Sequence, residues 1–479
     1  MNSMRSFFFC LLAVSAPPTF GGAGADTDSR HLVILHINDT HGRLFPYELE
    51  TGEEVGGIAR LSTLVRNIRE ENEGRVLLLH AGDIFSRGDP VTVHYGGYVN
   101  FRAMERIGFD VLTPGNGEFY FGIENLQRQS ARVSFPLIHA NGVYKNHGGS
   151  IFPPYVIKEV DGVRIGILGL GVIRMWPPSS HTLEMRDPVE TAGKYVPKLQ
   201  ELTDVIIALT HLGTPADERL VSEISGIDLV VGGHTHTPLF EPLRVPKGNE
   251  EGEVVIVNAG GYMRALGRLD VTLTETEEGF RISDVNGKLL PIDAGIEMDP
   301  EITRFLDEYA TPLDEVIHVA EESMDNPPSG ENTMGNLVAE AMLAETRSEI
   351  AMLDRSAVRA GIVAGEVLLA DVYRIHPWRN RVVSLRLTGA EIEAILSQHD
   401  ILAAGCRFRR TNEGIEDLEV AGEPVDPERL YLVAAGEFFV RRLEEPKAGR
   451  PEPTGLRVNT ALERYLRRAN ADQCRGGKQ

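Results

Sequence analysis

Cysteine, basic side chains and long apolar runs are all scarce in this chain of 479 residues. One of its three cysteines, Cys10, lies in an N-terminal segment that we expect to be removed. Cys406 and Cys474 are then left to form one disulfide or to stay free. Lys and Arg number 48 against 70 Asp and Glu, which gives a formal net charge of -22. Such an acidic surface repels nucleic acids and anionic membranes, so we expect neither as a partner.

The N-terminus has the pattern of a secretory signal over residues 1–25. Met1–Arg5 carries one basic side chain, Phe7–Val14 is an apolar run, and Ala23–Ala25 offers a small-x-small cleavage site. The alternative is a disordered or buried N-terminus. The apolar run is too short to span a bilayer, and no later segment is long and apolar enough to do so. The pattern predicts a periplasmic or secreted protein without a membrane anchor after cleavage.

From His31 onward, short apolar runs alternate with helical patterns. Helical periodicity occurs in Ile58–Glu70 and Gly97–Ile107. The strand-length apolar runs are Leu32–Ile37, Val76–Leu79, Val111–Thr113, Ile165–Leu170, Val205–Leu209, Leu229–Val231 and Val254–Val257. This alternation predicts an α/β fold with a mostly buried sheet.

The pattern changes near Asp299, where Asp followed by Pro is a helix start signal. We expect a connecting helix over Asp299–Ile317. A turn-rich segment at 325–330 precedes a second amphipathic helix that begins near Met334. The predicted domains are therefore residues 31–298 and 323–479, joined by a linker at 299–322.

Metal-binding side chains follow five of the predicted strands. In α/β sheets, ligands bind beyond the carboxyl ends of the strands, so these side chains should converge. The candidates are Asp39, His41, Asp83, Asn116, His211, His234 and His236. Two Asp, one Asn and four His are too many ligands for one ion but suit two, with a carboxylate between them. This mixture of nitrogen and oxygen ligands favours Zn, Mn, Fe or Co over Ca or Mg; we expect Zn or Mn, which these ligands do not distinguish.

The seven candidates form motifs such as Asp39-x-His41 and His234-x-His236. The order and spacing of these motifs resemble those of the calcineurin-like metallophosphatases, in their 5′-nucleotidase branch. The resemblance implies an N-terminal four-layer α/β/β/α sandwich and a smaller α/β C-terminal domain that binds substrate. It implies that Asp39, His41 and His236 hold one metal and that Asn116, His211 and His234 hold the other. Asp83 would bridge the two ions, and Asp83 and Asn116 would act at the catalytic centre. The other histidines, such as His80, are isolated in the sequence and are better explained as structural or solvated.

The same resemblance locates the substrate residues in the C-terminal domain. Arg359, Arg379, Trp378 and Phe438 are the candidates. Trp378 is either a stacking platform or a core residue, and the basic residues Arg379, Arg381, Arg441 and Arg442 either bind anions or form a solvated face. The aromatic pair that the family uses to hold a nucleoside base is incomplete, because Val382 stands where one ring is expected and the family's Gly-Gly-Asp-Gly-Tyr segment is absent.

One further departure from the family lies beside Asn116. Gly117 stands where the family has a catalytic His, and Tyr120 stands where it has the Asp that orients that His. Loss of a general acid lowers rates by roughly 10²–10⁴-fold, so we expect slower or altered chemistry. Glu118 and Tyr120 either take over an acid role or serve packing and loop hydrogen bonding.

These observations predict an exported phosphoesterase, monomeric or homodimeric, that hydrolyses a nucleotide or another small phosphorylated compound with two divalent ions. Two alternatives remain. One is a thiosulfohydrolase of sulfur oxidation. Such enzymes resemble 5′-nucleotidases, and a different substrate would explain the changes at Gly117 and Tyr120 and in the nucleoside site. The other is a metal-binding protein whose catalysis is impaired.

Overall fold

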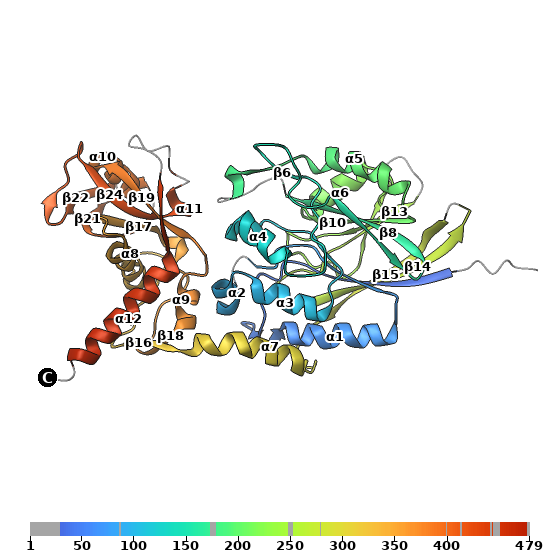
Figure 1. Ribbon diagram of the computed structural model, residues 1–479, viewed down its shortest axis with the longest axis horizontal. Helices are drawn as coiled ribbons and strands as arrows, with labels where there is room; N and C mark the ends of the chain where they lie inside the picture. Colours follow the sequence, from blue (N-terminus) through green and yellow to red (C-terminus); the bar gives the residue numbers. More distant parts are fainter. Residues whose placement is uncertain are drawn as a thin grey trace, which may run out of the picture.

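The computed structural model describes residues 29–85, 88–172, 179–247, 252–277, 279–398, 400–411, 414–440, 443 and 451–476. The predicted signal segment, Arg441 and Arg442 lie outside these residues. Figure 1 shows two lobes, with the larger N-terminal lobe and the smaller C-terminal lobe side by side. Among the described residues, no helix combines the length and hydropathy needed to cross a bilayer.

Two separate sheets form the centre of the N-terminal lobe. The first has the order β15-β14-β1-β4-β5, and the second has the order β12-β13-β11-β10-β8-β7. The strands of the first sheet are β1 (Ser29–Ile37), β4 (Val76–His80), β5 (Val111–Leu112), β14 (Ala265–Thr276) and β15 (Gly279–Pro291). Those of the second are β7 (Tyr155–Val160), β8 (Val163–Gly171), β10 (Val205–His211), β11 (Leu229–Val231), β12 (Leu243–Pro246) and β13 (Glu253–Val257).

The alternation of side chains along each strand places these sheets face to face. In β1, Leu32 and Ile34 point into a core shared with Ile165 and Ile207 of the second sheet. On the opposite face of β1, Val33 and Leu35 pack in the core that includes α1 (Ile58–Glu71) and α3 (Tyr98–Ile107). The outer face of the second sheet packs on α5 (Pro188–Gln200) and α6 (Thr214–Glu223). The layers are therefore α/β/β/α, and the expected fold class is confirmed.

The C-terminal lobe is built on a mixed sheet of order β20-β17-β24-β19-β25. Its strands are β17 (Ile350–Asp354), β19 (Arg381–Thr388), β20 (Ile401–Ala404), β24 (Leu430–Gly436) and β25 (Glu452–Arg457). Helices α8 (Thr333–Thr346) and α12 (Val458–Gly476) contact each other, and α10 (Gly389–Gln398) packs in a separate core with β19. Smaller pairings are β16 (Val316–Ala320) with β18 (Gly365–Leu368), and β21 (Cys406–Thr411) with β22 (Gly414–Val420).

The connecting segment is shorter as a helix than expected. Helix α7 spans Pro300–Ala310, a 3-10 turn follows at Thr311–Asp314, and β16 begins at Val316. The carboxylate of Asp299 caps α7 by accepting hydrogen bonds from the amides of Glu301 and Ile302. Pro312 lies in the 3-10 turn, where its ring disfavours a continuing α-helix.

Helix α2 (Pro90–Tyr95) of the N-terminal lobe meets α9 (Leu369–Ile375) of the C-terminal lobe. The ring of His94 lies edge-on to the ring of Tyr373, with centroids 4.9 Å apart. Tyr95 makes a similar contact with Tyr309 of α7 at 5.1 Å. This aromatic interface joins the two lobes near the position of α2 in Figure 1.

Candidate metal centre

The loops after β1 and β4 run side by side beyond the first sheet. The amide of Asp39 donates to the carbonyl of Gly82 at 2.9 Å, and the amide of His41 donates to the carbonyl of Asp83 at 2.9 Å. Asp39, His41 and Asp83 all have positive φ, of 50°, 49° and 55°. This conformation is costly for residues other than glycine and typically occurs where the surroundings hold a functional side chain in place.

Glycine is required where the loops of three strands meet. A Cβ at Gly82 would lie 2.5 Å from the amide nitrogen of Gly115, and φ there is +86°. A Cβ at Gly115 would lie 2.3 Å from Oδ1 of Asp83 and 2.6 Å from Nε2 of His211. These contacts leave no room for a larger residue beside the predicted ligands.

Three of the predicted ligands form the first cluster: Asp39, His41 and His236. The Nε2 atoms of His41 and His236 lie 2.8 Å apart, and Nε2 of His236 lies 3.2 Å from Oδ1 of Asp39. Asp39 Oδ2 instead accepts hydrogen bonds from Nδ2 of Asn38 and from the amide of His234. These two donors turn the carboxylate so that Oδ1 faces the imidazoles. The function of Asn38 was not foreseen in the sequence, although it directly precedes the Asp-x-His motif.

A second cluster lies beside the first and shares Asp39 with it: Asp39, Asp83 and His211. Nε2 of His211 lies 3.3 Å from Oδ1 of Asp83 and 3.9 Å from Oδ1 of Asp39. His234 is close by, with its ring centroid 5.1 Å from that of His211. Asp83 also approaches the first cluster, because its Oδ2 lies 3.8 Å from Nε2 of His41. Both sheets therefore supply candidate ligands to one site, in which Asp39, Asp83 and His211 are buried.

The chemistry of this donor set fits divalent metal ions. Oδ1 of Asp39, Oδ1 of Asn116 and Nε2 of His211 are buried and have no hydrogen-bond partner within the described residues. Burial by itself would raise the pKa of Asp83, but the charge of His211 lowers it. Burial likewise opposes a charged His211, yet the carboxylates of Asp83 and Asp39 raise its pKa. The buried carboxylates therefore need a positively charged partner, and the polar atoms without hydrogen-bond partners are available to bind a metal cation.

Glu118 supports the loops that carry these ligands. Its carboxylate is fully buried and accepts hydrogen bonds from the amides of Asp83, Ile84, Phe85 and Gly115, at 2.6 to 3.2 Å. Burial, and then the negative charge of Asp83, raises the pKa of Glu118 to about 7, while the amides of Gly115 and Phe85 lower it. Loop hydrogen bonding, one of the two roles considered for this residue, is therefore observed.

Tyr120 and Gly117 also lie against the predicted ligands. Nδ2 of Asn116 donates to the hydroxyl of Tyr120 at 3.2 Å, which leaves Oδ1 of Asn116 as the orphaned atom. The amide of Gly117 donates to Oδ1 of Asp83 at 2.6 Å. The position where the family has its histidine therefore contributes a backbone hydrogen bond to the site and no side chain.

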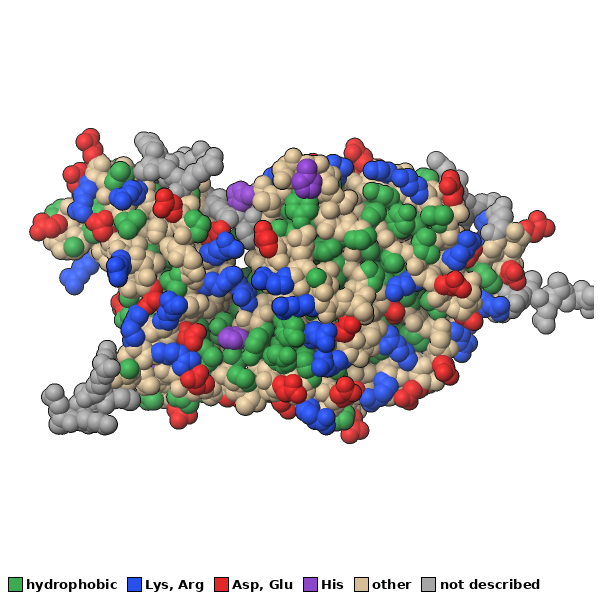
Figure 2. All heavy atoms as spheres, in the orientation of Figure 1, with side chains coloured by type: hydrophobic (Ala, Val, Ile, Leu, Met, Phe, Trp, Pro, Cys, Tyr) green, Lys and Arg blue, Asp and Glu red, His purple; other side chains and the backbone are tan. Residues whose placement is uncertain are grey.

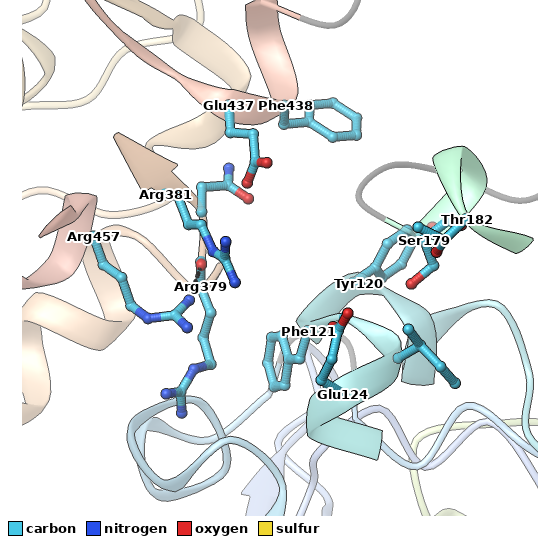
Figure 3. Close-up of a pocket in the computed structure, with 13 residues that line it drawn as sticks. Tyr120, Phe121, Glu124, Ser179, Thr182, Arg379, Arg381, Glu437, Phe438 and Arg457 are labelled. Carbon is cyan, nitrogen blue, oxygen red and sulfur yellow. Dashed lines mark hydrogen bonds between the residues drawn. The ribbon is translucent and has the colours of Figure 1, made fainter. Parts of the chain in front are cut away.

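The lobes enclose two neighbouring cavities that share Tyr120, Phe121, Arg379 and Phe438. The larger, of about 280 Å³, contains Trp378 and Ala357 in its wall, and the smaller, of about 140 Å³, is drawn in Figure 3. Trp378, Arg379 and Phe438 thus lie together, as the substrate prediction requires. Val382 is fully buried, so it offers no stacking surface.

Arg379 and Arg359 are placed differently from each other. Nη1 of Arg379 donates to the carbonyls of Val93 and His94 at the C-terminal end of α2, which joins the two lobes. Arg359 is exposed in a separate groove, alongside Pro327, Arg355 and Asp400. The structure therefore brings three of the four predicted substrate residues to one place and leaves Arg359 apart.

Both alternatives for Cys406 and Cys474, one disulfide or two free thiols, stay open. Cys406 is half-buried in β21, and burial raises the pKa of its thiol to about 11. The side chain of Cys474 lies outside the described residues.

Comparison with known proteins agrees with this architecture. Residues 32–238 match the calcineurin-like phosphoesterase family model, and residues 315–442 match the 5′-nucleotidase C-terminal domain. The trifunctional nucleotide phosphoesterase YfkN of Bacillus subtilis is 31% identical over 77% of this chain, which spans 27% of that relative. The solved 5′-nucleotidase precursor of Thermus thermophilus is 27% identical, with a TM-score of 0.65 over 92% of this chain and 97% of that one.

A sulfate thiohydrolase, SoxB of Thermus thermophilus, is also similar. It is 22% identical, with a TM-score of 0.59 over 92% of this chain and 94% of that one, and this likeness shows the fold alone. Both halves of the chain match the two domains of one enzyme family, in the same order. The chain belongs to the 5′-nucleotidase family and is a phosphate ester hydrolase.

Proposed function

We propose that the chain is an exported phosphoesterase that uses two divalent ions, Zn or Mn, to hydrolyse nucleotides or other small phosphorylated compounds. The observation that carries this proposal is the group of Asp39, His41, Asp83, His211 and His236, in which the buried atoms Oδ1 of Asp39 and Nε2 of His211 have no hydrogen-bond partner within the described residues. Export is inferred from the signal pattern in residues 1–25.

Asp39, His41 and His236 would hold one ion, and Asn116, His211 and His234 would hold the other. Asp83 would bridge them, because its two oxygens face different clusters: Oδ1 lies near His211 and Oδ2 near His41. When bound, such a pair of ions activates a water molecule at neutral pH and stabilises the negative charge that develops on the phosphoryl oxygens.

The chain's own residues hold this arrangement rigid. Asn38 and the amide of His234 fix the orientation of Asp39, and Glu118 fixes the backbone at Asp83. Gly117 has no side chain, so this position offers the leaving group no proton donor. We therefore expect turnover below that of family members that have the histidine, by roughly 10²–10⁴-fold.

The experiment that tests the proposal is phosphate release from a panel of phosphoesters. The panel contains nucleoside monophosphates, a sugar phosphate and p-nitrophenyl phosphate, and the protein is loaded with Zn or Mn to two ions per chain. The matched control is Asp83→Ala, which removes the bridging carboxylate. Release by the wild-type chain and none by the variant supports the proposal. Two bound ions with no release from any compound would overturn it.

A further inference from the structure

The smaller cavity has a wall of arginines that the metal centre does not use. Arg379, Arg381 and Arg457 line one side of it, and all three come from the C-terminal lobe. In Figure 3 they lie opposite Tyr120 and Phe121 of the N-terminal lobe. Glu124 and Glu437 also line the cavity, so positive charge exceeds negative charge by one among these side chains. The volume of about 140 Å³ holds a tetrahedral anion with several waters, since one water needs about 10–15 Å³.

The arginines are held close together by the backbone. Nη1 of Arg457 donates to the carbonyl of Arg379, and Arg379 is itself held by the carbonyls of Val93 and His94. Burial, and then the charge of Arg457, lowers the pKa of Arg379 to about 10. Burial, and then the charge of Arg381, lowers the pKa of Arg457. Positive charges that lie close together in a partly dry cavity repel one another, and an anion bound between them offsets this repulsion.

Arg381 differs from Arg379 in what it can offer a ligand, and Arg457 has one guanidinium nitrogen, Nη1, bonded to the carbonyl of Arg379. Arg379 has its Nη1 hydrogen-bonded to helix α2 and supports the lobe interface. Arg381 is exposed at the start of β19, and its guanidinium makes no hydrogen bond or ion pair within the described residues. The planar fork of a guanidinium suits bidentate contact with phosphate, sulfate or carboxylate.

This cavity is next to the metal centre. Tyr120 forms part of its wall, and the hydroxyl of Tyr120 accepts the hydrogen bond from Asn116. The side chain of Tyr120 therefore lies between this cavity and Asn116, a proposed metal ligand. A molecule with one anionic group at the metals could reach the arginines with a second group.

We propose that Arg381 and Arg457 form a subsite for a second phosphate of the substrate, so that small molecules with two separate phosphate groups are preferred over monophosphates. The inference rests on the proposed phosphoesterase function. The second group need not react: it remains bound at the guanidiniums while the ester at the metal centre is cleaved.

The kinetic test compares two substrates, AMP and adenosine 3′,5′-bisphosphate, with the metal-loaded full-length chain. The measured quantity is the ratio of kcat/KM for the bisphosphate to kcat/KM for AMP. Arg381→Gln combined with Arg457→Gln is expected to lower this ratio about tenfold or more, because charge-assisted hydrogen bonds are lost. Arg386→Gln, at an exposed position of the same strand, is the control and should keep the wild-type ratio.

If the double variant does not fold, Arg381→Gln alone is the test, because this residue is exposed. A ratio that stays at the wild-type value in a folded variant would overturn the proposal, as would a wild-type preference for AMP.

Calorimetric titration of chelator-treated, full-length protein with inorganic sulfate separates this inference from the proposed function. Sulfate binding by the wild-type chain, weakened about tenfold in Arg381→Gln, supports the subsite even if no phosphoester is hydrolysed. Absence of sulfate binding by the wild-type chain would overturn the subsite even if hydrolysis is observed.

Discussion

Oε2 of Glu118 accepts a hydrogen bond of 2.9 Å from the backbone amide of Asp83. The same oxygen accepts a second one, of 2.7 Å, from Gly115. One buried carboxylate thus ties the loop after β4 to the loop after β5 and fixes the spacing of two predicted ligands, Asp83 and Asn116. Residues that position ligands in this way influence metal affinity without touching the metal.

Glu118→Gln should therefore weaken both the fold and the metal site. The amide group of Gln offers only one acceptor atom, so at least one pair of backbone amides loses its acceptor inside the protein. We expect a loss of about 1–3 kcal/mol in the free energy of unfolding and roughly 10–100-fold weaker metal binding. Urea denaturation and competition with a chelator measure the two effects. The exposed Glu184→Gln variant is the control, and equal metal affinity in both variants would contradict the positioning role.

Asp83→Ala should lower the metal content of the protein from two ions per chain to one or none, because the second cluster loses a carboxylate whose other oxygen also faces His41 of the first cluster. Metal analysis by mass spectrometry after dialysis measures this directly. His147→Ala is a suitable control, since His147 is exposed and far in sequence from every proposed ligand. A variant that retained two ions would show that Asp83 does not bridge them.

Replacing Gly117→His together with Tyr120→Asp should raise phosphoesterase activity about 10²–10⁴-fold, because it restores the family's general acid and its orienting carboxylate. The steady-state rate with p-nitrophenyl phosphate is the measurement. Gly117→Gln with Tyr120→Asp is the control, because Gln has similar size and no proton to donate at neutral pH. Equal rates for the two double variants would argue against a missing acid as the limiting feature.

Asp217→Asn should make the dependence of stability on pH shallower. Asp217 is fully buried, one oxygen accepts from the hydroxyl of Thr210 at 2.7 Å, and burial raises its pKa to about 7. The native state therefore holds the proton of the Asp217 carboxyl more tightly than the unfolded chain does. The free energy of unfolding falls as pH rises from about 4 through about 7. The Asn variant, which resembles the protonated acid, avoids this loss.

At pH 8 we expect Asp217→Asn to unfold with a free energy about 2–4 kcal/mol higher than the wild type, and the difference should shrink towards pH 4. Urea denaturation at pH 5, 7 and 8 measures it. The exposed Asp307→Asn variant is the control. A gain that was the same at every pH would contradict the assignment to this carboxyl.

Arg379→Gln should loosen the contact between the lobes. Its guanidinium donates to two carbonyls at the end of α2, and Gln is too short to replace both contacts. We expect a loss of about 1–3 kcal/mol in stability and a larger radius of gyration in solution scattering. Arg386→Gln, exposed on the neighbouring strand β19, is the control. An unchanged radius of gyration would mean that the aromatic contact of His94 with Tyr373 holds the lobes without Arg379.

Local patterns in the sequence were sufficient for much of the fold. The sequence predicts a helix at Ile58–Glu70, and α1 is observed at Ile58–Glu71. The strand predicted at Leu229–Val231 is observed with the same bounds. These elements are long or strongly apolar, so burial reinforces the local preference. The helix predicted over Asp299–Ile317 is longer than the observed α7, which ends at Ala310, because Pro312 disfavours a regular α-helix beyond that point.

The sequence by itself determined the candidate metal ligands, because each Asp, Asn or His follows an apolar strand and the carboxyl ends of parallel strands meet at one edge of a sheet. Tertiary structure alone decided that Asn38 and Glu118 orient the candidate ligands, and that Arg379, in the wall of the cavities between the lobes, donates to α2. The reason is physical. Strand and helix preferences arise between neighbours in sequence, whereas hydrogen-bond partners 35 to 286 residues apart are chosen by packing.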